Sequence, residues 1–193
     1  VGEKTVQNFW LEATNPGGHS SVPRPDNAIT DLTAAVVAVN RHEFPVQFTD
    51  TTRTYFATLA KVMPDPVGPA MARLLTNPND AEANRIVSMD PTNHSVLRTT
   101  CVTTLLEAGH AENALPQSAT ATVNCRVFPG ETIAQTQAAL QAAVGQPGDG
   151  RGMHELIEVA GGEAAGIERL PLGLGDQRCS LGQGKGRNLV GRA

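Results

Sequence analysis

Residues 15–23 read NPGGHSSVP, and this stretch separates two segments of different character. Before it, residues 5–14 (TVQNFWLEAT) are rich in β-branched and aromatic side chains, which predicts a strand. After it, Asp26 is a candidate N-cap for a helix whose apolar residues between 29 and 39 repeat at helical spacing. The paired glycines allow positive φ before His19, so we expect an exposed histidine on a strand-to-helix turn. Functional side chains are often found on such turns.

The second half of the chain carries further strand and helix signals. Residues 99–107 (TTCVTTLLE) and 119–128 (ATATVNCRVF) are β-branched runs, and in the second run the odd-numbered residues would share one face. A capping box of Thr132 and Gln135 begins a helix that runs to residue 144. The candidate for a last strand is 154–160 (HELIEVA). This order predicts an α+β fold, a ferredoxin-like βαββαβ sandwich.

Two segments fall outside that repeat of strands and helices. A helical insertion is predicted at residues 46–98. It has β-leaning pieces at 46–49 and 54–56 and short helices at 67–75 and 81–89. We expect one domain over 1–160. From 161 to 193 the chain is rich in Gly, Arg and Gln with no sustained apolar period, which predicts a poorly ordered tail. A shifted reading frame or a truncated gene would produce such a tail.

Charge and hydropathy exclude several classes of partner. The 193 residues carry a net charge of −4, so no basic field points to nucleic acid or to an anionic membrane. No apolar run approaches the ~20 residues that cross a bilayer. No signal peptide is visible, which favours a cytoplasmic over a periplasmic location, although a chain that begins inside a longer protein would have lost one.

The three cysteines, Cys101, Cys125 and Cys179, are scattered, odd in number and form no Cys-x-x-Cys pair. This distribution argues against a disulfide framework or a zinc knuckle. Since Cys101 and Cys125 each lie inside a strand-like run, we expect both to be buried thiols.

Two blocks resemble a known family. NPGGHSSVP, followed later by residues 111–116 (AENALP) and 119–126 (ATATVNCR), resembles the lid, or dimerisation, domain of the M20 family of zinc-dependent peptidases and amidohydrolases. The resemblance covers residues 5 to 144 and fails beyond them. It implies a ferredoxin-like lid domain that forms a homodimer. It also implies a full-length parent that uses zinc to hydrolyse a peptide or the amide bond of an N-acyl amino acid.

The resemblance also implies roles for three side chains. His19 would enter the active site of the partner subunit and donate a hydrogen bond to the oxyanion. Asn113 would hold a substrate carbonyl or carboxylate, and Arg126 would pair with the substrate's terminal carboxylate. The residues taken alone leave simpler alternatives open: a polar surface histidine, an asparagine in a turn, and an arginine on a sheet face.

The chain lacks the ligands of a two-zinc centre. Such a centre needs a cluster of His, Asp and Glu, which the family supplies through a His-x-Asp motif, a Glu-Glu pair and a late histidine. Neither motif occurs here, and the closest look-alike is the loop segment from His110 to Glu112. We therefore expect no metal or other cofactor on this chain, and no hydrolysis by the chain alone.

Two alternative functions fit the sequence less well. A serine hydrolase is disfavoured because Ser20 and Ser21 lie in no Gly-x-Ser-x-Gly motif. The second alternative is a stand-alone ferredoxin-like module that binds a partner or a small molecule. That alternative predicts a pocket or partner surface complete within this chain.

Overall fold

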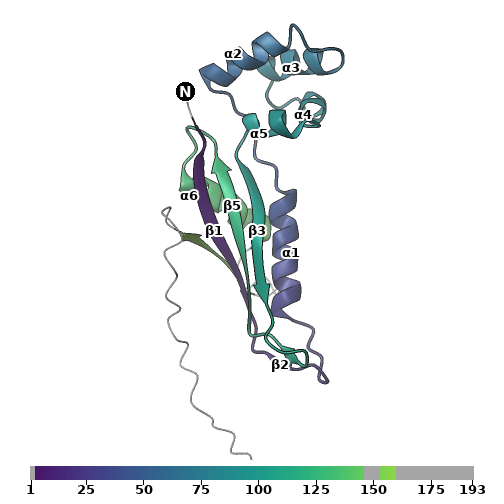
Figure 1. The fold of residues 1–193 in the computed structure, drawn as a ribbon, viewed down its shortest axis with the longest axis vertical. Coiled ribbons are helices and arrows are strands. Elements are labelled where there is room, and N and C mark those ends of the chain that lie inside the picture. Colours follow the sequence, from purple (N-terminus) through teal and green to yellow (C-terminus); the bar gives the residue numbers. More distant parts are fainter. Residues whose placement is uncertain (1–2, 146–152, 160–193) are drawn as a thin grey trace, which may run out of the picture. The chain divides into compact units, whose positions relative to one another are not determined.

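The computed structural model describes residues 3–145 and 153–159, with side chains for the first range (Figure 1). Its helices are α1 (Ala28–Arg41), α2 (Asp50–Leu59), α3 (Val67–Thr76), α4 (Ala81–Val87), α5 (Pro91–Val96) and α6 (Ile133–Val144). Its strands are β1 (Thr5–Thr14), β2 (Gly18–His19), β3 (Thr100–Ala108), β4 (Ala114–Leu115), β5 (Ser118–Val127) and β6 (Met153–Val159).

The main sheet has four strands in the order β3-β5-β1-β6, and every neighbouring pair is antiparallel. β1 and β5 form the central pair, in register from Thr5 opposite Val127 to Thr14 opposite Ser118. With α1 between β1 and β3 in the sequence and α6 between β5 and β6, this is the split βαββαβ topology. The predicted ferredoxin-like fold is confirmed.

Buried and exposed residues alternate along the strands, so one face of the sheet is buried. The core lies between this face and the helices that cover it. Alternate residues of β1 and the odd-numbered residues of β5 are buried, as predicted for β5. α1 packs against β1, β3 and β5 and buries a stripe at helical spacing. The fully buried large residues of this core each contribute about 1.5–3 kcal/mol by leaving water; they include Phe9, Leu11, Leu32, Val39, Val123 and Leu140.

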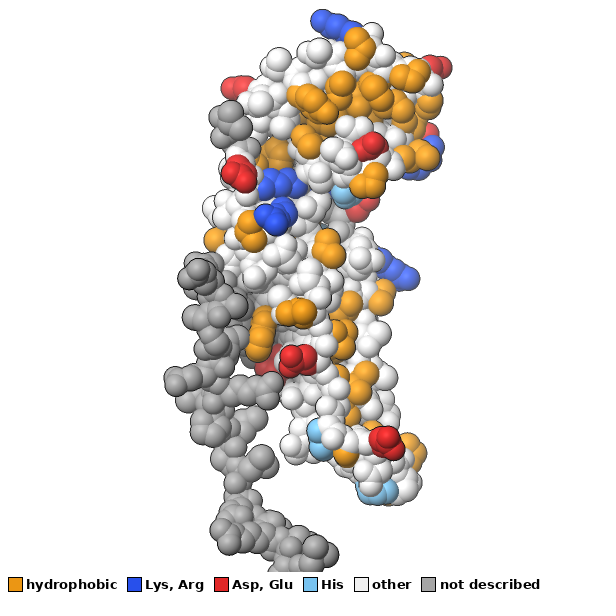
Figure 2. Space-filling view, in the orientation of Figure 1, with side chains coloured by type: hydrophobic (Ala, Val, Ile, Leu, Met, Phe, Trp, Pro, Cys, Tyr) orange, Lys and Arg blue, Asp and Glu red, His pale blue; other side chains and the backbone are white. Residues whose placement is uncertain are grey.

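The segment between α1 and β3 is helical and has a core of its own. α2, α3, α4 and α5 surround a buried cluster of Phe56, Ala70, Met71, Leu74, Ala83, Val87 and Leu97. Figure 2 shows hydrophobic side chains gathered on the surface of this helical segment. The β-leaning interpretation of residues 54–56 is wrong, because they lie inside α2. A capping box between Thr49 and Thr52 starts that helix and outweighs the β propensity of its aromatic residues.

A buried arginine secures the return from this helical segment to the sheet. Arg98 is 1% exposed and donates hydrogen bonds to Asn84 and to the Ser88 hydroxyl, the second at 3.2 Å. It also lies 3.5 Å from the carboxylate of Glu43, which precedes the segment. Burial lowers the pKa of Arg98. The guanidinium thus connects three parts of the chain: α4, the segment before α2 and the segment after α5.

The N-cap of α1 differs from the predicted one. Asn27, not Asp26, accepts the hydrogen bond from the N–H of Ile29 at 2.8 Å. The physical reason is competition, because the Asp26 carboxylate is already held by Arg24 and Asn15.

The expectation of two buried thiols is also wrong. Cys101 and Cys125 form a disulfide between β3 and β5, where their Cα atoms lie opposite each other at 4.1 Å. The spacing in the sequence does not predict this pairing, since it depends on the register of the hairpin. Cys179 lies outside the described residues.

The predicted last strand is present as β6, but most of the C-terminal predictions cannot be placed on the structure. Residue 160 of the predicted strand and the predicted tail at 161–193 lie outside the described residues. In the part of the chain that is described, no helix is long and apolar enough to span a membrane.

Candidate functional site

His19 lies on a small hairpin-like extension at one end of the main sheet, where β1 ends and β5 begins (Figure 1). There β2 pairs with β4, so that His19 is opposite Ala114. The N–H of Ser20 donates to the carbonyl of Asn113 at 2.9 Å. The structure therefore brings two of the three predicted site residues, His19 and Asn113, to the same end of the sheet. Both are exposed.

The turn before His19 requires a glycine at its first position. Gly17 has φ +77°, a left-handed conformation that residues with a Cβ rarely adopt. A Cβ at this position would also lie 2.9 Å from the Cγ of Gln117 and 3.1 Å from the carbonyl oxygen of Leu115. The glycine thus lets the loop approach the strand that follows Asn113 closely.

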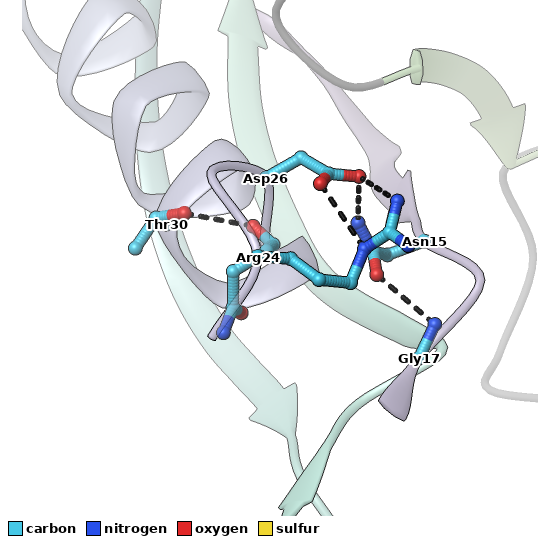
Figure 3. A network of polar contacts seen from close by, with 6 residues as sticks. Asn15, Gly17, Arg24, Asp26 and Thr30 are labelled. Carbon is cyan, nitrogen blue, oxygen red and sulfur yellow. Dashed lines mark hydrogen bonds and ion pairs between the residues drawn. The ribbon is translucent and has the colours of Figure 1, made fainter. Parts of the chain in front are cut away.

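A polar network connects the two ends of the loop formed by residues 15–26, which carries His19 (Figure 3). The buried side chain of Asn15 donates to Asp26 at 2.7 Å and accepts the N–H of Gly17 at 3.0 Å. Arg24 donates two further hydrogen bonds to Asp26, at 3.1 and 3.0 Å. These contacts hold the pKa of the Asp26 carboxyl below its usual value, and the hydrogen bond from Arg24 has the largest effect. The loop that carries His19 is therefore closed between residues 15 and 26.

Arg126 lies at the opposite end of the sheet. It is exposed near the end of β5, opposite Val6 on β1 and Thr100 on β3. The eight-residue step from Ser118 to Arg126 corresponds to roughly 26 Å of extended strand. His19 and Asn113 lie past the Ser118 end of β5. Arg126, the third predicted site residue, is therefore not brought together with them.

The end of the sheet that carries Arg126 is electropositive. Lys4 donates a hydrogen bond to the hydroxyl of Thr100 at 3.4 Å, and its pKa is lowered to about 8. The main cause is burial, followed by the positive charges of Arg98 and Arg126, while Glu131 acts in the opposite direction. An anion such as a carboxylate would be stabilised here. Sequence reasoning missed Lys4, because only the strand register places it beside Arg126.

The described side chains do not fit a zinc centre. Among the side chains of residues 3–145, no group of three or more His, Cys, Asp or Glu could hold a metal ion. The segment from His110 to Glu112 is exposed and contributes no such group.

The fold and its histidine-bearing turn are those of a lid-type α+β domain, and the comparison with protein families agrees. The model of the peptidase dimerisation domain of M20 enzymes matches residues 1–151. The chain belongs to this family, which confirms the predicted resemblance. The alternative of a stand-alone binding module is not favoured.

Two curated relatives show how much of a longer protein the chain represents. It is 35% identical over 136 residues to the N-fatty-acyl-amino acid synthase/hydrolase PM20D1 of Homo sapiens, covering 69% of this chain and 26% of that protein. It is 33% identical over 133 residues to the probable carboxypeptidase S-like 2 of Dictyostelium discoideum, covering 68% and 25%. The chain thus spans about a quarter of the length of these relatives.

Among solved structures, the M20 family metallo-carboxypeptidase Sso-CP2 of Sulfolobus solfataricus is 16% identical, with a TM-score of 0.47 and coverage of 81% of this chain and 43% of that one. Human carnosine dipeptidase 1 is 13% identical, with a TM-score of 0.42 and coverage of 73% and 32%.

Proposed function

We propose that this chain is the dimerisation domain of a longer M20-type hydrolase that cleaves an amide bond close to a free carboxylate. The substrate class follows from the names of the relatives, an N-fatty-acyl-amino acid hydrolase and a carboxypeptidase. Both names describe substrates with an amide bond next to a carboxylate, that is, N-acyl amino acids and peptides.

The separation of the three site residues carries the proposal. His19 and Asn113 lie at one end of the sheet and Arg126 at the other, roughly 26 Å away along β5. In such a substrate the amide carbonyl and the free carboxylate lie within the roughly 7 Å that two extended residues span, so His19 and Arg126 of the same chain do not both reach them. If all three residues act on one substrate, His19 and Asn113 must come from one subunit and Arg126 from another.

Each side chain suits one part of such a substrate. The His19 imidazole would donate a hydrogen bond to the oxyanion that forms when water adds to the amide carbonyl. The Asn113 amide would hold a carbonyl or carboxylate oxygen, and the Arg126 guanidinium would pair with the terminal carboxylate in a bidentate way. Because the described residues do not fit a zinc site, the metal of the parent enzyme would be held outside this domain.

The proposed dimer has a suitable surface on β3, which lies at the edge of the main sheet. Val102, Leu105 and Leu106 on this strand are 58%, 66% and 55% exposed. Val37 of the neighbouring α1 is 42% exposed. An edge strand with exposed apolar side chains is a ready site for pairing with a second copy, and we propose it as the dimer contact.

Kinetics of single variants in the full-length parent test the assigned roles. His19→Ala should lower kcat by about 10²–10³ without loss of zinc, since one oxyanion donor is removed. Arg126→Ala should mainly raise KM, because a ground-state contact is lost. His110→Ala, which removes another exposed histidine, is the matched control and should change neither parameter. An unchanged kcat in His19→Ala would remove this residue from the mechanism.

A further inference from the structure

We infer that Ser21 is a positioning residue that sets the tautomer of His19, so that the imidazole presents Nε2–H to its surroundings. The catalytic meaning of this inference rests on the proposed function, but the tautomer itself does not.

The evidence is a pair of contacts at one ring nitrogen. The backbone N–H of Ser21 donates to Nδ1 of His19 at 3.2 Å, and the Ser21 hydroxyl lies 2.8 Å from the same nitrogen. A backbone N–H can only donate, so Nδ1 must offer its lone pair. The Ser21 hydroxyl then also donates to Nδ1. In a neutral imidazole the proton must therefore be on Nε2.

The backbone around the ring holds this arrangement in place. The N–H of Val22 donates to the His19 carbonyl at 3.0 Å, which closes a turn over Ser20 and Ser21. On the other side, Ser20 is tied to Asn113, and β2 is paired with β4. Since Ser21 is only two residues from His19, the turn itself brings its amide to the ring.

This tautomer suits an oxyanion donor. The Nε2 atom has no hydrogen-bond partner among the described residues, and the side chain is exposed. A neutral imidazole with Nε2–H can donate to a developing negative charge without first being protonated. The other tautomer would turn a lone pair toward the oxyanion and repel it.

Nuclear magnetic resonance of this chain tests the tautomer directly. At alkaline pH, where imidazoles are neutral, we expect the ¹⁵N spectrum to show Nδ1 of His19 unprotonated and Nε2 protonated. We also expect a ¹⁵N–¹⁵N coupling through the hydrogen bond between the Ser21 amide and Nδ1. A proton on Nδ1, an even mixture of the two tautomers, or no coupling would overturn the inference.

Activity of the full-length parent tests the consequence. Ser21→Ala removes the hydroxyl and keeps the amide, and loss of one hydrogen bond should lower kcat about fivefold with little change in KM. The matched control is Ser20→Ala, whose hydroxyl makes no hydrogen bond to the His19 ring and which should retain full kcat. Equal losses in the two variants would overturn the role of Ser21.

The outcomes separate this inference from the proposed function. If the predicted tautomer is found but His19→Ala leaves kcat unchanged, the proposed function fails and the assigned tautomer stands. If His19→Ala lowers kcat but the proton is on Nδ1, only the role of Ser21 fails.

Discussion

At the scale of the residue, Gly17 controls where the loop places His19. It combines a left-handed φ of +77° with a close approach to Gln117 and Leu115. Gly109 has nearly the same φ, +80°, but nothing lies within 4 Å of the position of its Cβ. The two glycines therefore separate the effect of the backbone conformation from the effect of crowding.

We expect Gly109→Ala to lower the free energy of unfolding by about 1–2 kcal/mol, which is the penalty for the left-handed conformation. Gly17→Ala should lower it by about 1 kcal/mol more, because neighbouring atoms must also move. Denaturant titration of the two variants measures the difference. Equal losses would show that the loop does not depend on this close approach.

Lys4 predicts a dependence of stability on pH. Its pKa is about 8 in the folded chain against an ordinary 10.5, so between these values the unfolded state binds more protons. The free energy of unfolding therefore rises with pH through this window. Below about pH 8 Lys4 is charged in the folded chain, and its charge then destabilises the fold by the full amount.

Lys4→Met should accordingly be more stable than the wild type at neutral pH. The gain should be roughly 1 kcal/mol, reduced from the full pKa shift because the ammonium is partly solvated. The difference should shrink as pH approaches 10.5. A difference that stays constant across this range would contradict the assigned cause.

At the scale of elements, local signals were sufficient for most helices and strands. β1 was predicted with its observed bounds, and the capping box of Thr132 and Gln135 marked the start of α6. Each of these signals depends on neighbours in the sequence. Predictions failed where side chains had competing partners, as at Asp26, or where capping outweighed β propensity, as at α2.

Pairings between elements could not be predicted, and the disulfide is the clearest case. Cys101 and Cys125 lie on strands whose register contains an irregularity between Thr103 and Leu105. Only that register places the two cysteines opposite each other. Spacing in the sequence carries no such information.

The disulfide closes a loop with a sequence separation of 24 residues. In the chain-entropy model, removing it should lower the free energy of unfolding by about 3 kcal/mol. Denaturant titration should show this loss for the Cys101→Ala/Cys125→Ala double variant. A reducing agent should destabilise the wild type and leave the double variant unchanged. Equal sensitivity of both proteins to reduction would argue against the bridge.

At the scale of the whole molecule, the candidate site was only partly predictable. The motif around His19 and the segment around Asn113 identified residues that the structure places together. Arg126 was identified by the same resemblance, but its distance from His19 follows from the length and pairing of β5. This distance supports the proposal that two subunits share the site, which the resemblance already implied for His19.

Self-association should depend on the edge formed by β3. Leu105→Lys places a charge on a side chain that is 66% exposed, so it should block pairing of edges with little effect on folding. Val62→Lys changes a side chain that is 71% exposed on the helical segment and serves as the control. We expect sedimentation to show monomers for Leu105→Lys and dimers for Val62→Lys. A dimer that persists in Leu105→Lys would exclude this edge.

The most direct test of the proposed two-subunit site is complementation between impaired subunits of the full-length parent. A heterodimer of His19→Ala and Arg126→Ala has one site in which both residues are intact, so it should recover about half of the wild-type kcat/KM. A heterodimer of His19→Ala and Asn113→Ala should recover none, because these residues lie at the same end of the domain. Recovery in the first pair alone is the result we predict. No recovery in the first pair would contradict a site shared between two chains.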